Sequence, residues 1–297
     1  MALETSSFSL PTTALGAIVD RVRDESVIAK LSPERPTLFG NVAAVRLSRK
    51  PRAQIVAEGA QKAADDVELS SVTASPIKIQ TTVRVSDEVR WADADHQMGI
   101  VDEVTTAIAG SIARAVDLIA IHGINPLTGT AATSVTAALN DTNNRVAAAG
   151  APTDEVDEAV GLVASSGVHL PTGLGLDPAY AFALATDKDD EGRRLNPELG
   201  YGLNAAAYHG LGVARSSAVS GRPEAEDTGI RAIVGDFGQL AWGFQRNLPV
   251  SVIEFGDPDG EGDLQRLNQV AYRAEAVLYV AIFDVDAFAV VEEQQGS

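Results

Sequence analysis

The sequence predicts an α+β fold, and three observations support this. Residues 77–85 alternate apolar and polar side chains with a period of two, which is typical of a strand with one apolar face. A longer stretch, residues 97–122, repeats apolar residues every fourth position and predicts an amphipathic helix of about seven turns. Further short apolar runs between residues 230 and 291 are typical of strands.

Composition and charge narrow the classes of function. Of the 297 residues, 45% are apolar and 22% are charged, which indicates a folded chain of one large domain or two small ones. The formal net charge of −18 disfavours binding to nucleic acid phosphates and to anionic membranes. The chain has no cysteine, which excludes disulfides, thiol catalysis and cysteine-based zinc sites.

The N-terminus does not show the basic start and apolar run of a signal peptide. We find no stretch of the roughly 18–20 apolar residues that would span a bilayer. We therefore expect a cytoplasmic product without a membrane segment.

Two parts of the chain are predicted to project as arms. Residues 1–40 contain three prolines and predict an extended arm with one short helix at 13–23. Two predicted strands, 42–57 and 68–86, form a long hairpin with a small, charged tip between them. A hairpin with so little apolar surface does not stand alone, so we expect it to lean on the body or on a neighbouring subunit.

The remaining elements make up a mixed body. Gly123 is expected to end the long helix. A second helix is predicted to begin with Thr153 as its N-cap, followed by Asp154 and Glu155 in the first turn. A short helix is expected after Pro178, and strands are expected at 230–237, 240–256, 268–283 and 287–291.

The sequence contains no P-loop, HExxH or GxSxG motif, and its glycine pairs do not complete a dinucleotide fingerprint. The histidines are single and scattered, without an evident orienting partner. We therefore expect no enzyme and no cofactor.

An acidic stretch near the C-terminus partly matches a calcium loop. Asp257, Asp259 and Asp263 occupy loop positions one, three and seven, and Gly262 lies at the sharp turn. Position twelve is Asn268, where calcium needs a bidentate glutamate. A tight turn between two strands is therefore favoured over a metal site.

The order of these parts resembles the major capsid proteins of tailed bacteriophages, which share the Hong Kong 97-like capsid fold. The resemblance covers nearly the whole chain and depends on the order of its segments, since no short motif is diagnostic. It implies the following division: an N-terminal arm, 1–40; an extended loop, 41–90; a spine helix and peripheral domain, 91–166; an axial domain, 167–255; and C-terminal strands of the peripheral domain, 256–297.

The resemblance implies a shell subunit. Copies would assemble through hexamers and pentamers into an icosahedral shell that encloses the double-stranded DNA of a phage. Partners would be the chain itself, a scaffold protein, a portal and a decoration protein. No long scaffolding segment precedes the predicted arm, so we expect the scaffold to be separate or dispensable. The location would be the virion capsid, after assembly in the host cytoplasm.

The type member of this family joins its subunits by an isopeptide bond between a loop lysine and an asparagine, assisted by a carboxylate. The matching candidates are Lys62, Asn268 and Glu275, with Lys50 and Lys78 on the flanks of the loop. The alternative is that Lys62 is a solvated tip residue, Asn268 caps the start of a strand and Glu275 forms a salt bridge with Arg273.

Other classes of function stay open from the sequence. An encapsulin nanocompartment shell shares the fold and differs in the genes beside it. An acidic calcium-dependent binding module would use the loop at 257–268 and would respond to calcium titration. A hydrolase built on scattered carboxylates has no support in their spacing.

Overall fold

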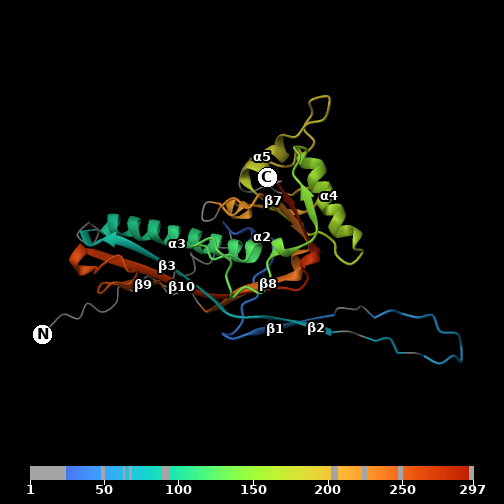
Figure 1. The fold of residues 1–297 in the computed structure, drawn as a ribbon, viewed down its shortest axis with the longest axis horizontal. Helices are drawn as coiled ribbons and strands as arrows, with labels where there is room; N and C mark the ends of the chain where they lie inside the picture. Colours follow the sequence, from blue (N-terminus) through green and yellow to red (C-terminus); the bar gives the residue numbers. More distant parts are fainter. Residues whose placement is uncertain are drawn as a thin grey trace.

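The computed structural model describes residues 25–47, 51–62, 64–66, 69–88, 94–201, 207–222, 226–246 and 250–293. The protein is elongated, with a helical and stranded body and a thin two-stranded ribbon that projects from it (Figure 1). The helix expected at 13–23 lies outside the described residues.

The first layer of the body is a four-stranded antiparallel sheet centred on β10 (Gln269–Ile282). One edge of β10 pairs with β3 (Ile77–Ser86) over ten residues. The other edge is shared by β9 (Val250–Ile253) and β8 (Leu240–Arg246). These strands confirm the predicted runs, and the alternation seen in residues 77–85 reflects the single apolar face of β3.

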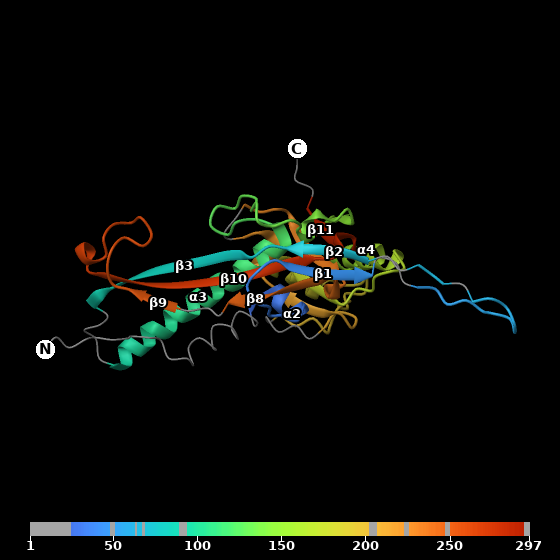
Figure 2. The same ribbon diagram turned by 90° about the horizontal axis from the view of Figure 1, so that it is seen from below.

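The predicted long helix is confirmed as α3 (Ala94–His122), which lies along this sheet (Figure 2). Gly123 ends it in a left-handed conformation with φ of 65°. By length and composition alone, Glu103–His122 could cross a membrane, contrary to our expectation that no stretch would. However, 72% of that window is buried inside the protein, so its apolar character belongs to the core.

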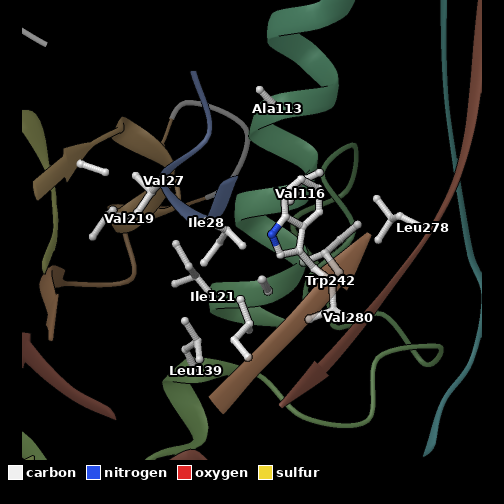
Figure 3. Packing of buried hydrophobic residues seen from close by; sticks show 14 of the residues in the cluster. Val27, Ile28, Ala113, Val116, Ile121, Leu139, Val219, Trp242, Leu278 and Val280 are labelled. Atoms are coloured by element: carbon white, nitrogen blue, oxygen red, sulfur yellow. The ribbon is translucent and has the colours of Figure 1, made fainter. Parts of the chain in front are cut away.

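The main core lies where α3 and β8 meet α2 (Val27–Leu31). Trp242 of β8 is fully buried there and packs edge-to-face with Phe244 at a centroid distance of 5.8 Å. Figure 3 shows Trp242 between α3 and the side chains of Leu278 and Val280 on β10. The buried tryptophan therefore packs the helix layer against the sheet.

The second layer is a mixed five-stranded sheet. Its strand order is β4 (Arg145–Ala147), β11 (Phe288–Glu292), β7 (Ile230–Gly235), β5 (Gly173–Leu176) and β6 (Gly212–Arg215). The two outer pairs are parallel and the inner pairs are antiparallel. One face packs against α4 (Pro152–Ser165) and α5 (Pro178–Thr186), whereas the other face joins the main core.

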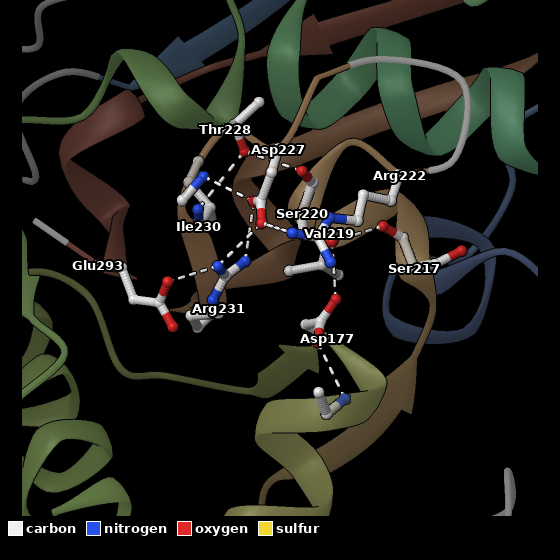
Figure 4. A network of polar contacts seen from close by, with 12 residues as sticks. Asp177, Ser217, Val219, Ser220, Arg222, Asp227, Thr228, Ile230, Arg231 and Glu293 are labelled. Atoms are coloured by element: carbon white, nitrogen blue, oxygen red, sulfur yellow. Dashed lines mark hydrogen bonds and ion pairs between the residues drawn. The ribbon is translucent and has the colours of Figure 1, made fainter. Parts of the chain in front are cut away.

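An ionic network holds the start of β7 in place. Arg231 donates to both carboxylate oxygens of Asp227 at 2.9 Å and to Glu293 at 2.6 Å (Figure 4). The hydrogen bonds from Arg231 lower the pKa of Asp227 to about 2. The network therefore joins the loop before β7 to the residue that follows β11.

The projecting ribbon consists of β1 (Val42–Leu47) and β2 (Leu69–Ala74), paired antiparallel from Val42 with Ala74 to Leu47 with Leu69. The single strand expected at 68–86 is wrong, because β2 pairs with β1 whereas β3 pairs with β10. The break falls at Ser75 and Pro76. Proline has no N–H for the ladder and restricts the preceding residue, which lets the chain change sheets there.

The predicted N-terminal arm also needs correction. Its described part, residues 25–40, is built into the body, and Val27 and Ile28 are buried. Arg35 donates its backbone N–H to the carbonyl of Trp242 at 2.8 Å, and the Trp242 indole donates to the carbonyl of Ser32 at 3.0 Å. An extended segment thus covers the outer edge of β8.

The expected start of the second helix is wrong by two residues. Ala151, not Thr153, is the N-cap of α4, while the N–H groups of Ala149, Gly150 and Ala151 all donate to Glu155.

The division of the chain at residues 166 and 255 stays a prediction. Strands on both sides of these boundaries share sheets, since β8 and β9 join β10, and β4 and β11 join the second sheet.

Candidate functional site

The loop beyond β1 and β2 carries the lysine candidate. Its tip is a turn in which Ala60 donates its N–H to the carbonyl of Ala57 at 3.0 Å, with Gly59 at φ of 77°. Lys62 follows this turn and is exposed. The geometry therefore presents the Lys62 amine to solvent on a projecting segment.

Arg52 and Asp65 join the two sides of this loop. Arg52 donates its backbone N–H to Asp65 at 2.5 Å, and its Nε lies 3.7 Å from the same carboxylate. Ile55 is fully exposed, and Val45 and Leu69 on the ribbon are about two-thirds exposed at 66% and 67%. A molecule that packed on this arm would bury these apolar side chains.

The acidic turn between β9 and β10 contains the calcium candidates. Arg84 of β3 reaches across and donates to Asp257 at 3.1 Å, to the carbonyl of Gly262 at 3.0 Å and, through Nε, to Asp259 at 2.8 Å. The hydrogen bond from Arg84 lowers the pKa of Asp259 to about 2. Asp263 instead accepts the backbone N–H of Arg266 at 3.0 Å.

This geometry favours the turn interpretation of the acidic loop. Two of the three candidate carboxylates, on Asp257 and Asp259, surround a guanidinium, which occupies the place a cation would take. Gly262 has φ of 103°, as a sharp turn requires. In the part of the chain that the structure describes, no group of three or more His, Cys, Asp or Glu could hold a metal.

The role of Arg84 was missed from the sequence. It lies 175 residues before Asp259, and its place on the polar face of a strand is not unusual. No local pattern could have paired the two.

The asparagine candidate lies just before β10. Asn268 is exposed and adopts a left-handed conformation with φ of 50°. Its carbonyl accepts the backbone N–H of Asp87 at 2.8 Å, which joins the turn to the end of β3. The Asn268 side chain is therefore presented at a fixed corner of the sheet.

The carboxylate candidate lies elsewhere on the same strand. Glu275 forms an ion pair with Lys78 of β3, with 3.1 Å between Oε2 and Nζ. The expected salt bridge with Arg273 is wrong, because the Arg273 guanidinium donates to Thr82 and to the carbonyl of Pro258. Seven residues of strand separate Glu275 from Asn268, which is about 23 Å at the usual rise. The structure therefore does not bring Asn268 and Glu275 of one chain together.

Lys62 and Asn268 are also far apart within one chain. The extended loop projects from one end of the molecule, whereas the turn that leads into β10 lies at the opposite end (Figures 1 and 2). Any contact between Lys62 and Asn268 consequently has to form between different copies of the chain.

Comparisons with known proteins agree on one family. The model of the phage capsid family matches residues 7–292. A search of curated proteins gave no match. A solved structure from Mycobacterium phage Ogopogo is 42% identical with a TM-score of 0.79, and covers 91% of this chain and 92% of its own. One from Gordonia phage Cozz is 31% identical with a TM-score of 0.76, covering 92% and 87%.

More distant structures share the fold. The capsid of an empty GTA particle is 16% identical, with a TM-score of 0.62 and coverage of 91% of this chain and 90% of its own. Neither the encapsulin nor the calcium-module alternative finds support among these matches.

Proposed function

The chain belongs to the phage capsid family and is a shell subunit, and we propose that its copies assemble through hexamers and pentamers into an icosahedral phage head. The family match over nearly the whole chain carries this proposal. The exposed apolar residues of the projecting ribbon are consistent with it, because a neighbouring copy packed on the ribbon would bury them. The interior of the head would hold double-stranded DNA.

The charge of the subunit fits a container for DNA. A net charge of −18 opposes tight binding of the wall to packed phosphates. We infer that the head is assembled in the host cytoplasm with a scaffold protein, and that it is completed by a portal and a decoration protein.

We also propose a division of the body that follows the sheets. A peripheral unit would combine α3 with β3, β8, β9 and β10. An axial unit would combine the five-stranded sheet with α4 and α5. The ribbon of β1 and β2 would remain a separate extended loop.

The cross-link is proposed as a bond between copies. The neutral Nζ of Lys62 attacks the side-chain carbonyl carbon of Asn268 in a neighbouring copy, the C–N bond to the asparagine nitrogen breaks, and ammonia leaves. A carboxylate accepts the proton that the amine loses and passes it to the departing asparagine nitrogen, which leaves as ammonia. Because of the distance along β10, the assisting Glu275 would belong to a different copy from the reacting Asn268.

Electron microscopy of the purified protein tests the shell, and a boiled denaturing gel tests the bond. Closed shells or hexamer-sized rings are expected, with a ladder of covalent oligomers on the gel. Lys62→Arg and Asn268→Asp should each remove the ladder and leave the shells intact. A monomer that forms no rings, even beside its scaffold, would contradict the shell proposal.

Lys78→Arg is the matched control for the lysine. It keeps the positive charge beside Glu275, so it should leave the ladder unchanged. Shells that give a single unshifted band would contradict the bond alone. A ladder that is lost in Lys78→Arg and kept in Lys62→Arg would show that Lys78, and not Lys62, forms the bond.

A further inference from the structure

Asp117 is a fully buried carboxylate in the most apolar part of α3, between Val116 and Leu118. Three of its hydrogen-bond donors come from the start of α2, and the hydroxyl of Ser216 is a further partner. The Ser26 hydroxyl donates at 2.6 Å, and the backbone N–H groups of Val27 and Ile28 each donate at 3.0 Å. Asp117 is therefore the site on the spine helix that receives the N-terminus of α2.

Apolar contacts complete this docking. Val27 and Ile28 lie between α3 and Val219 in Figure 3. Ser26 is the N-cap of α2, and its Oγ also accepts the N–H of Ala29 at 3.1 Å. One hydroxyl thus caps α2 and joins it to the spine helix.

The charged groups around this site do not neutralise the carboxylate. Glu25 and Arg114 both approach Gly110, two turns of α3 away from Asp117, and Lys30 on α2 is exposed. His122 is bound at Nε2 to the carbonyls of Ala218 and Val219, and burial lowers its pKa.

The remaining packed segment contributes only a hydroxyl. A hydrogen bond with Ser216 favours the charged form of Asp117, as do its bonds with Ser26, Val27 and Ile28. In the described residues Asp117 forms no ion pair, so its charge is balanced by hydrogen bonds alone. Burial outweighs them and raises the pKa of Asp117 to about 6.

The sign of the resulting pH dependence follows from proton linkage. When α2 leaves, water reaches the carboxylate, and its pKa falls back toward the ordinary 3.8. The docked state therefore binds a proton more tightly than the undocked state, so docking gains free energy as the pH falls from about 6 toward 4. A protonated carboxyl still has acceptor capacity for the donors of α2.

We propose that Asp117 makes the docking of α2 on the spine helix a proton-linked step, firm in acid and looser near neutral pH. The segment concerned connects the N-terminal part of the chain to the body. The proposal concerns the single chain and does not depend on shell assembly.

Amide hydrogen exchange on dissociated full-length subunits tests this. Peptides that cover residues 25–32 are followed from pH 5 to 7.5, with rates corrected for the intrinsic pH dependence. Protection should be about tenfold greater at pH 5 than at pH 7, from a pKa that moves between about 6 and 3.8. Peptides from β10 serve as the internal reference, and their protection should be the same at pH 5 and at pH 7.

Two variants assign the effect to Asp117. Asp117→Asn has no proton to gain, so the ratio of protection at pH 5 to protection at pH 7 should be close to one. Ser26→Ala removes a donor to the charged form, so it should move the onset of the change to higher pH, and it carries the test if Asp117→Asn does not fold. His122→Gln should retain the full ratio.

Equal protection at both pH values, or a ratio that persists in Asp117→Asn, would overturn the proposal. Loss of the ratio in His122→Gln would overturn it too, because the proton would then belong to the histidine.

Discussion

Two segments predicted as arms behave differently in the folded chain. The segment at 25–40 is bonded to β8 and β10, whereas the loop at 51–66 projects with few contacts. Neither segment has a repeating apolar pattern, so the sequence does not show which of the two would pack against the body. The difference lies in distant residues, since Trp242 and Tyr279 supply hydrogen bonds to the first segment only.

This comparison explains why the first arm was mispredicted. Its anchors are backbone groups, including the carbonyls of Ser32 and Arg35, which accept from the Trp242 indole and the Tyr279 hydroxyl. Every residue has a carbonyl, so the sequence carries no mark of which ones are used. Docking of such a segment can be inferred only when its receiving surface is known.

The largest expected effect comes from removing the surface that receives the docked segment. Trp242→Ala leaves a cavity in the main core and removes the indole donor to Ser32. The free energy of unfolding should fall by about 3–5 kcal/mol. Guanidinium unfolding of dissociated subunits measures this.

Trp242→Phe is the control for volume, because it keeps an aromatic ring and loses the indole N–H. It should cost less than Trp242→Ala. Equal unfolding midpoints for Trp242→Ala and the unaltered chain would show that this contact does not hold the segment.

A smaller effect is expected where the docked segment approaches the sheet most closely. A Cβ on Gly243 would lie 2.3 Å from the carbonyl oxygen of Arg35, which is backbone and cannot move without shifting the segment. Gly243→Ala should lower the free energy of unfolding by about 1–3 kcal/mol, as overpacking does. Thermal unfolding of the subunit measures the change.

Gly161→Ala is the matched control, because Gly161 lies inside α4 with no atom within 4 Å of the added Cβ. The same substitution should there stabilise the subunit by about 0.5–1 kcal/mol, since alanine favours the helix. Two changes of the same sign would contradict the steric explanation at Gly243.

Much of the fold was predictable because its signals are local. The helix expected at 97–122 is α3, and the strand expected at 268–283 is β10, since both periodicities are written in consecutive residues. The pairing of Arg84 with Asp257 and Asp259, and of Ser26 with Asp117, depends on residues about 90 or more positions apart. One signal for Asp117 was available, since it interrupts the apolar run around it.

The candidate cross-link shows the same limit. Lys62, Asn268 and Glu275 were found through resemblance to a family, which provides residues without distances. If the proposed bond forms, the length of strand between Asn268 and Glu275 would require different copies to provide them.

The smallest effect on the subunit, and the sharpest test of the comparison, is expected at Ile55. This side chain is fully exposed on the projecting loop, so Ile55→Ser should change the free energy of unfolding by less than about 0.5 kcal/mol. Assembly should nevertheless decline, because the apolar surface offered to another copy is smaller. Light scattering of the assembly reaction, beside denaturant unfolding of the subunit, separates the two effects.

Ile28→Ser applies the same chemical change to the docked segment, where Ile28 is fully buried in the main core. Its unfolding free energy should fall by at least about 2 kcal/mol, because burial of the isoleucine is lost and a hydroxyl enters an apolar site. Unfolding curves that coincide for the two variants would remove the distinction between the segments. If Ile55→Ser instead destabilised the dissociated subunit, the loop would be folding against its own body, and its exposed residues would no longer argue for a neighbouring copy.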